Sequence, residues 1–221
     1  MKHHGMIFNS EMVRAILDGR KTQTRRMVKL PLKDPMFGCE IAGCEINGLL
    51  KDGYSMGPIR VGDIIWVRET WAAVDWCDKS KPSDFGSAVW YQATNSGPHA
   101  AAAIPYKTDK RGKWRPSIHM PRWASRIDLE VTAVRLERVQ DIDKNGSIAE
   151  GIERVRAGVH EAWKNYLFKG EPKKGQEITD KEHRIVGFES PCASFSSLWQ
   201  SIYSNWDENP FVWAYEFRRV K

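Results

Sequence analysis

Short apolar segments separated by connections of very unequal length constrain this fold most. The clearest segment is the C-terminal NPFVWAYEFRRVK, in which four aromatic residues alternate to one face: Phe211, Trp213, Tyr215 and Phe217. We expect this stripe to lie in the core. Further strands are predicted around residues 7–8, 21–28, 64–67, 88–94 and 125–139. Because the connections are too irregular for βαβ repeats, we predict an α+β chain built on a small β-barrel.

Helical spacing marks the segments that flank these strands. Apolar residues recur at intervals of three and four residues within 12–17 and again within 194–206. Ser10 is the predicted N-cap of the first helix, and Gly19 suits the position after its end.

A shorter helix is predicted over 141–152, where Ser147 and Glu150 have capping-box spacing. Residues 31–60 and 154–190 have no clear period, so both are predicted to be insertions. A helix around 159–168 is an option within the second one.

The composition indicates whether the chain can form a core and in which cellular compartment it is expected. Of its 221 residues, 41% are hydrophobic, which suffices for a real core. There is no run of about 18 apolar residues, so no membrane span and no membrane partner are expected. The N-terminal MKHHGMIFNSEM has no signal-peptide core, which makes the cytoplasm the expected location.

The cysteines do not suggest a metal site. Cys39, Cys44, Cys77 and Cys192 are scattered, and no CxxC pair is present. Structural zinc sites normally have compact ligand pairs, so a site that adds His99 or His119 is disfavoured. We expect reduced thiols, no metal and no other cofactor.

The net charge of +6 is concentrated in residues 107–126, where one acid, Asp109, accompanies seven cations. Clustered cations with interleaved tryptophans suit phosphates and exposed bases, whereas the alternative is a solvated loop with buried tryptophans. The candidate binding residues in this stretch are Lys110, Arg111, Lys113, Trp114, Arg115, His119 and Arg122. His119 could instead be a hydrogen-bonded structural residue.

Five segments together resemble one known family, the ASCH domain of the PUA-like superfamily, in the long form common in phages and prophages. They are GRKTQTRR, GDIIWVRETW, WRPSIHMPRWASRI, the AEG after the short helix, and NPFVWAYEFRRV. The resemblance implies a single domain over residues 1–221: a PUA-like barrel with flanking helices, insertions at 31–60 and 154–190, and a cleft that faces nucleic acid or a nucleoside.

One subgroup of this family, the small bacterial N4-acetylcytidine amidohydrolases, uses a lysine, a threonine and a glutamate. Lys21, Thr24 and Glu150 match these catalytic residues, and Arg26 matches the last arginine of their turn. We expect Arg26 to point inward, within reach of Glu150 or Glu69. Ser147 stands where that subgroup usually has alanine, and its chains are roughly half as long. Other ASCH members resemble ribonucleases, so the resemblance implies either hydrolase as an alternative to binding.

These residues are chemically sufficient for amide hydrolysis without a metal. A threonine hydroxyl needs a base, and a lysine can serve only if burial or nearby cations lower its pKa. Glu150 could protonate the leaving amine. Because residues 21 and 24 face opposite sides of a regular strand, Lys21 must lie before the strand begins. In the structural alternative, Lys21 caps the preceding helix and Glu150 completes a capping box.

Arg68 and Glu69 end the predicted strand where PUA-like barrels open their cleft, so they either pair internally or face a ligand. Trp66 and Trp71 are more typical of a core than of a stacking platform. The sequence therefore predicts recognition of RNA, single-stranded nucleic acid or a modified nucleoside through a basic cleft. The rival is a hydrolase in the same cleft, and a third possibility is a phage accessory protein that binds a host protein.

Overall fold

The computed structural model describes residues 1–29, 31, 40, 57–73, 89–95, 112–157, 160–168 and 187–221. The chain divides into two compact units. Unit 1 comprises Met1–Asp18, Gly62–Glu130 and Arg218–Lys221, and unit 2 comprises Gly19–Val61 and Val131–Phe217.

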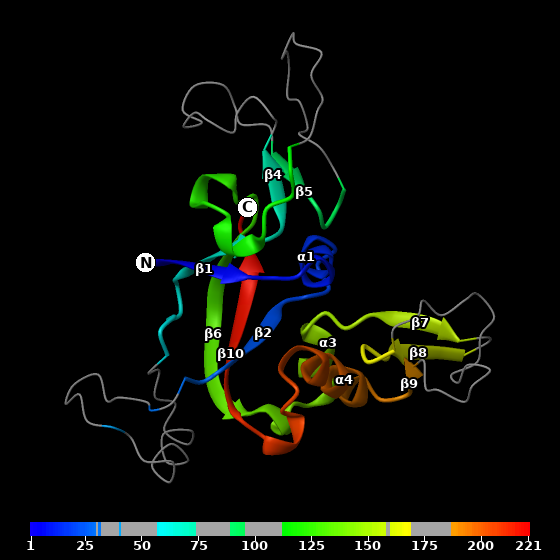
Figure 1. Ribbon diagram of the computed structural model, residues 1–221. Helices are drawn as coiled ribbons and strands as arrows, with labels where there is room; N and C mark the ends of the chain where they lie inside the picture. The colour runs from blue at the N-terminus through cyan, green and yellow to red at the C-terminus, as the bar shows by residue number, and fades with distance from the viewer. Residues whose placement is uncertain are drawn as a thin grey trace. The chain divides into compact units, whose positions relative to one another are not determined.

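Figure 1 labels the helices and strands. The strands are β1 His3–Ile7, β2 Gln23–Met27, β3 Ile64–Arg68, β4 Trp71–Ala73, β5 Val89–Tyr91, β6 Asp128–Arg138, β7 Arg154–Ala157, β8 His160–Lys164, β9 Gly187–Phe188 and β10 Phe211–Arg219. The α-helices are α1 Ser10–Leu17, α3 Lys144–Ala149 and α4 Pro191–Tyr203. Short 3-10 helices are η2 Ser117–His119, η3 Arg122–Ala124, η4 Val139–Asp141 and η5 Trp206–Glu208.

The largest sheet has the strand order β1-β3-β6-β10-β2. Within unit 1, β1 pairs with β3 in parallel and β3 pairs with the start of β6 antiparallel. Inward residues of these strands, such as Ile65, Val67 and Leu129, are buried. A second pair of strands, β4 and β5, carries Trp71 and Val89 into a cluster with Met120. Trp71 is thus a core residue, as predicted.

The N-cap of the first helix lies one residue earlier than predicted. The side chain of Asn9, not of Ser10, accepts a hydrogen bond from the Met12 amide, so the prediction of Ser10 as N-cap is wrong. Asn9 has extended backbone angles, which suit an N-cap. Gly19 follows the helix with a φ of 74°, in the left-handed region that glycine adopts readily.

Within unit 2, β2 pairs antiparallel with β10, and Thr24 lies opposite Tyr215. Phe211, Trp213, Tyr215 and Phe217 are buried, which confirms the predicted core stripe. Val212 on the other face of β10 is buried too, because α4 and the η4 region cover it. Their core cluster contains Val139, Ile142, Ile152, Phe195, Leu198, Trp199 and Val212.

The short helix α3 ends at the candidate site. The side chain of Asp143 caps it by accepting from the Gly146 amide, and Glu150 is its C-cap. The predicted capping box is therefore wrong, because Ser147 lies inside the helix rather than before it. α4 confirms the helix predicted within 194–206, and it packs against α3 (Figure 1).

The option of a helix around 159–168 is wrong, since β8 occupies residues 160–164 between β7 and β9 in a three-stranded sheet. Most of the insertion predicted at 31–60 lies outside the described residues, as do 158–159 and 169–186 of the second insertion.

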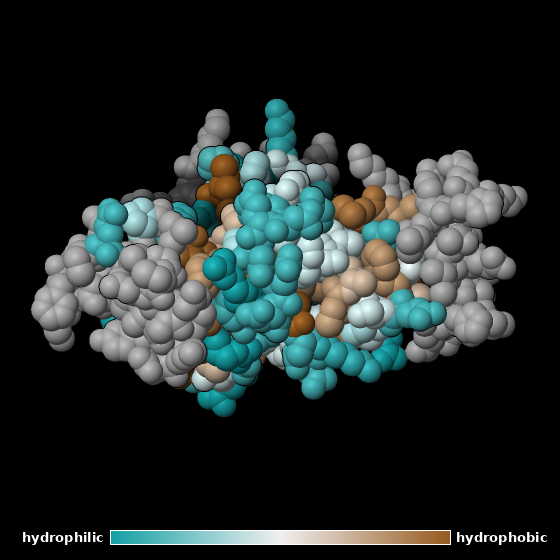
Figure 2. Space-filling view, turned by 90° about the horizontal axis from the view of Figure 1, so that it is seen from below, coloured by the Kyte–Doolittle hydropathy of each residue, from teal (hydrophilic) through white to brown (hydrophobic). Residues whose placement is uncertain are grey.

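The fold class is mixed α+β, with sheets and few helices. The described strands do not close into a barrel. On the face drawn in Figure 2, hydrophilic residues form a broad teal area, and hydrophobic residues gather in smaller brown groups. Among the residues described, none of the helices is both long and apolar enough to span a bilayer.

Candidate functional site

The segment between α1 and β2 holds Lys21 outside the regular strand, as the predicted chemistry requires. Lys21 forms an isolated antiparallel bridge with Glu150, while β2 starts only at Gln23. The next residue, Thr22, donates its amide to the Ala149 carbonyl at 2.9 Å and accepts from the Phe217 amide at 2.9 Å. These backbone hydrogen bonds hold the turn that precedes β2 in place, with the end of α3 on one side and β10 on the other.

Lys21, Glu150 and Arg25 form a buried ionic group. The Lys21 ammonium (Nζ) donates to Glu150 Oε2 at 2.7 Å and to the Glu150 carbonyl oxygen at 2.8 Å. Arg25 Nη1 donates to the other carboxylate oxygen of Glu150 at 3.1 Å. The side chains of Lys21, Arg25 and Glu150 are 0%, 2% and 4% exposed, respectively. One carboxylate thus bridges two cations away from water.

The environment of Lys21 shifts its acid–base behaviour. Burial lowers the pKa of Lys21, the charges of Arg26 and Arg25 act in the same direction, and Glu150 opposes them. A lowered pKa is what a lysine acting as a base requires. The ammonium is nevertheless held by two acceptors of Glu150, which is also what a purely structural ion pair requires.

Arg25 is the functional candidate that sequence reasoning missed. The prediction placed Arg26 within reach of Glu150 or Glu69, whereas the bond to Glu150 comes from Arg25. Arg25 also donates through Nε to Glu137 at 2.7 Å and through Nη1 to Gln23 at 3.0 Å. Arg26 is half-buried and lies in register with Trp213.

Thr24 is buried in β2. Because side chains alternate along a strand, Thr24 and Arg26 share one face of β2, and Gln23 and Arg25 share the other. The face of Gln23 and Arg25 is the one that contacts Glu150. The turn before β2 therefore brings Lys21 to Glu150, while the strand itself turns Thr24 to the opposite face.

A cavity of about 400 Å³ adjoins this ionic group. Its lining is polar, with two acids against one cation, and consists of Thr22, Gln23, Thr132, Arg135, Asp143, Asn145, Gly146, Ala149, Glu216 and Phe217. Arg135 pairs with Glu216 and Glu137, so its charge is already compensated. The cavity thus differs from the basic cleft expected from the sequence.

Gln23 connects the cavity with the ionic group. Its Oε1 accepts from Arg25 Nη1, and its Nε2 donates to Glu216 Oε1 at 3.5 Å. Arg25 therefore fixes which end of the Gln23 amide carries the donors. This side chain lines the cavity from β2, while Asn145 lines it from α3.

Glu69 and Arg68 both belong to unit 1. Glu69 is bonded by Arg126, through Nε at 2.8 Å and Nη2 at 2.9 Å, and Arg126 also lies 4.0 Å from the Tyr91 ring centroid. Burial raises the pKa of Glu69, and Arg126 opposes this shift. Arg68 donates to the Ile118 carbonyl and lies over the half-buried Trp66 ring. Glu69 is thus satisfied internally.

The predicted basic stretch is described from residue 112 onward, so Lys110 and Arg111 lie outside the described residues. Arg115 is half-buried over the Trp71 ring, at 5.2 Å from its centroid. Arg122 pairs with Asp128 at 2.7 Å.

The remaining candidates of this stretch differ in exposure. Lys113 and His119 are exposed, and Trp114 is half-buried. Arg115 is therefore tied to the core, whereas Lys113 and His119 face solvent.

Within the described ranges, no cluster of three or more His, Cys, Asp or Glu side chains could hold a metal ion. Cys192 is a free, half-buried thiol that contacts Ser147 and the Ile142 carbonyl, and the other three cysteines fall outside those ranges.

No protein-family model, curated protein or solved structure matches this chain. Its function must therefore be inferred from its own residues and their geometry.

Proposed function

We propose that this protein recognises RNA, another single-stranded nucleic acid or a modified nucleoside, and that one base lies in the cavity lined by Gln23 and Asn145. The observation that carries the proposal is the polar, net acidic cavity beside the buried Lys21–Glu150–Arg25 group. Its volume of about 400 Å³ falls within the range of small-molecule sites, which is about 300–1,000 Å³.

The charge of the lining favours a base over a phosphate. Asp143 and Glu216 outnumber Arg135, and an anionic phosphate would be repelled there. Carboxylates accept from the exocyclic amine of cytosine, and amides pair with adenine. Among the described residues, the hydrogen bonds to the Glu216 side chain all reach Oε1, which leaves Oε2 for a ligand donor. A base with an exocyclic amine, such as cytosine or adenine, suits this lining best.

The buried ionic group explains how such a site could be selective. Gln23 is held by Arg25, which is held in turn by Glu150 and Glu137. A side chain fixed before binding discriminates better than a mobile one, because less entropy is lost on binding. The ASCH resemblance, which implies a PUA-like barrel with a cleft for nucleic acid or a nucleoside, supports the same interpretation.

A thermal-shift screen against unmodified and modified nucleosides tests this function. We expect nucleosides with an exocyclic amine, or its acylated form, to raise the melting temperature of the wild type. Thr132→Trp should abolish the shift, because Thr132 is exposed on β6 and lines the cavity. Ser201→Trp adds the same bulk at an exposed position of α4 and should leave it intact. Equal shifts in both variants would refute the site.

An amidohydrolase acting on acylated cytidine is a second candidate, and the contact between Lys21 and Glu150 at full burial favours it. In that case the wild type should release acetate from N4-acetylcytidine in the presence of a chelator. Lys21→Ala should remove most of the rate, whereas Thr24→Ala should remove it only if Thr24 reaches Lys21 from the opposite face of β2. Binding without any turnover leaves recognition as the function.

A further inference from the structure

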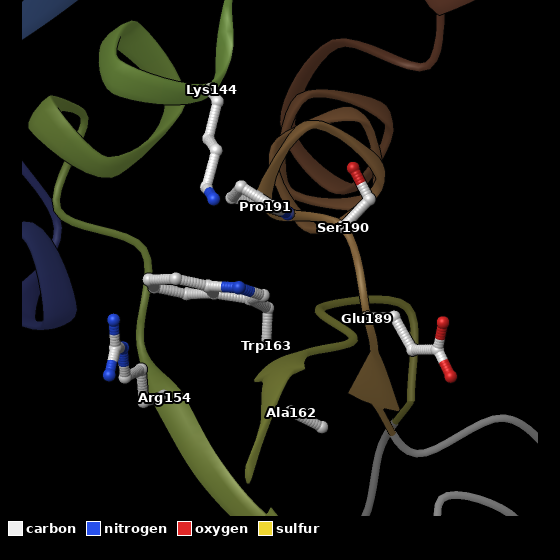
Figure 3. Close-up of a pocket in the computed structure, with 7 residues that line it drawn as sticks. All are labelled: Lys144, Arg154, Ala162, Trp163, Glu189, Ser190 and Pro191. Carbon is white, nitrogen blue, oxygen red and sulfur yellow. The ribbon is translucent and has the colours of Figure 1, made fainter.

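Unit 2 contains a second cavity, also of about 400 Å³, whose lining shares no residue with the first. It lies where β7, β8 and the start of α4 meet, and Figure 3 shows its lining: Lys144, Arg154, Ala162, Trp163, Glu189, Ser190 and Pro191. Neither the ASCH resemblance nor the proposed nucleoside site involves this cavity.

Trp163 gives the cavity a flat aromatic wall. The indole packs against the core cluster of unit 2 and is only half-buried. Arg154, its cross-strand partner, places its guanidinium 4.8 Å from the centre of the indole. In Figure 3, Arg154 lies on one side of the indole plane, and Lys144 and Pro191 lie on the other. One face of the ring thus meets the Arg154 cation, which also lines the cavity, and the other face is turned toward Lys144 and Pro191.

The charge of this cavity is opposite to that of the first. Lys144 and Arg154 outnumber Glu189, and Figure 3 shows the Lys144 amine directed toward the indole while the Glu189 carboxylate points away. Lys144 is exposed, and its amine has no partner among the described residues. Ser190 makes no capping hydrogen bond to α4, so its hydroxyl is a further donor at the wall.

We infer that this cavity binds one nucleotide of a single-stranded nucleic acid, with its base stacked on Trp163 and its phosphodiester at Lys144. Every base has a face that can stack on an aromatic ring, and a cation behind that ring strengthens the contact. A phosphodiester carries one negative charge, which matches one lysine ammonium. The phosphate of a free mononucleotide carries up to two negative charges, of which one ammonium compensates only one.

The position of α3 relates this nucleotide to the proposed nucleoside. Lys144 lines the second cavity, while the next residues, Asn145 and Gly146, line the first. A single strand crossing α3 can therefore place one base in each cavity. The stacking site does not depend on the first cavity, because an unmodified strand suffices to occupy it.

Fluorescence anisotropy with two labelled strands tests the inference. One is an unmodified ten-nucleotide RNA, and the other is an abasic strand of equal length and charge. Trp163→Leu should weaken binding of the RNA about ten- to hundredfold, as expected for the loss of one stacked base. The abasic strand should bind this variant and the wild type equally. Trp163→Phe, which keeps an aromatic face, should retain most of the affinity for RNA.

Lys144→Gln tests the phosphate contact without touching the core. It should lower the slope of log affinity against log salt by roughly 0.7, the contribution of one phosphate in a single strand. Lys29→Gln removes the same charge at an exposed lysine that lines neither cavity, and it should leave the slope unchanged.

Three results would overturn this site. They are failure of the wild type to bind RNA at low salt, equal weakening of both strands by Trp163→Leu, and equal slope changes in the two lysine variants. A mononucleotide that binds as tightly as the ten-nucleotide RNA would likewise contradict the inference. None of these measurements uses a modified nucleoside, so they leave the first cavity to be judged by its own test.

Discussion

Lys21 and Glu150, 129 residues apart in the chain, form an ion pair at 2.7 Å with the lysine side chain fully buried. The same carboxylate holds Arg25 at 3.1 Å. Buried charges tolerate the loss of a partner poorly, because the remaining charge is left without compensation. The relationship therefore ties the stability of unit 2 to the geometry of the candidate site, through Arg25 and Gln23.

We expect Glu150→Gln to destabilise the protein more than Lys21→Met. Glu150→Gln leaves both Lys21 and Arg25 without its charge and should cost about 3–5 kcal/mol. Lys21→Met leaves Glu150 still paired with Arg25, so its cost should be smaller, about 1–3 kcal/mol. Urea unfolding of the two variants measures both costs. A larger cost for Lys21→Met would show that Arg25 does not hold Glu150.

The stability of the wild type relative to Lys21→Met should rise with pH. Because burial lowers the pKa of Lys21 below 10.5, the unfolded chain binds more protons than the folded one between the lowered pKa and 10.5. Stability increases with pH wherever the unfolded state binds more protons, here by up to about 1.4 kcal/mol per pH unit. Urea unfolding of both proteins at several pH values tests this, and a difference that falls toward pH 10 contradicts it.

In unit 1, Arg126→Lys should cost about 1–3 kcal/mol, because it removes the two-pronged bond to buried Glu69 and the contact with the Tyr91 ring. Arg122→Lys is the matched control. That arginine is 40% exposed and bonds Asp128 through Nη2, so its cost should stay below about 1 kcal/mol. Thermal unfolding compares the two, and similar costs would refute the special role of Arg126.

Variants of Lys113 and Arg115 should distinguish an electrostatic role in binding from a structural role within the basic stretch. Lys113→Gln should leave stability unchanged, because the side chain is exposed, and should lower the salt slope of nucleic-acid binding by roughly 0.7. Arg115→Ala should lower the melting temperature, because Arg115 packs over the buried Trp71. An unchanged slope in Lys113→Gln would move the binding surface elsewhere.

Local patterns predicted the core well, whereas they extended the strand to Lys21, which lies before β2 begins. The buried stripe of β10 and the glycine after α1 follow from spacing and backbone freedom, which neighbouring residues decide. Whether Arg25 or Arg26 faces Glu150 depends on the residue at which β2 begins. The backbone hydrogen bonds of Thr22 to Ala149 and Phe217 determine where the strand begins. Such partners are far apart in the sequence, so no local pattern reveals them.

The second cavity escaped prediction for the same reason. Within this stretch of no clear period, residues 154–190, the strands β7 and β8 are only four and five residues long, too short to give a visible alternation. In the sequence, Trp163 is one of three closely spaced aromatic residues, with Tyr166 and Phe168, in a charged segment. Only the pairing of β7 with β8 brings Arg154 beside it, and only the packing of α3 adds Lys144.

Calorimetric titration of the wild type and Thr132→Trp with cytidine, N4-acetylcytidine and uridine is the decisive measurement for the base-reading cavity between Gln23 and Asn145. We predict that at least one cytidine form binds the wild type with one-to-one stoichiometry. Uridine should bind at least about tenfold more weakly, because it leaves the carboxylates of the cavity without an amine donor. Thr132→Trp should bind none of the three. Equal affinity for uridine, or binding that survives Thr132→Trp, would contradict recognition of a base in this cavity.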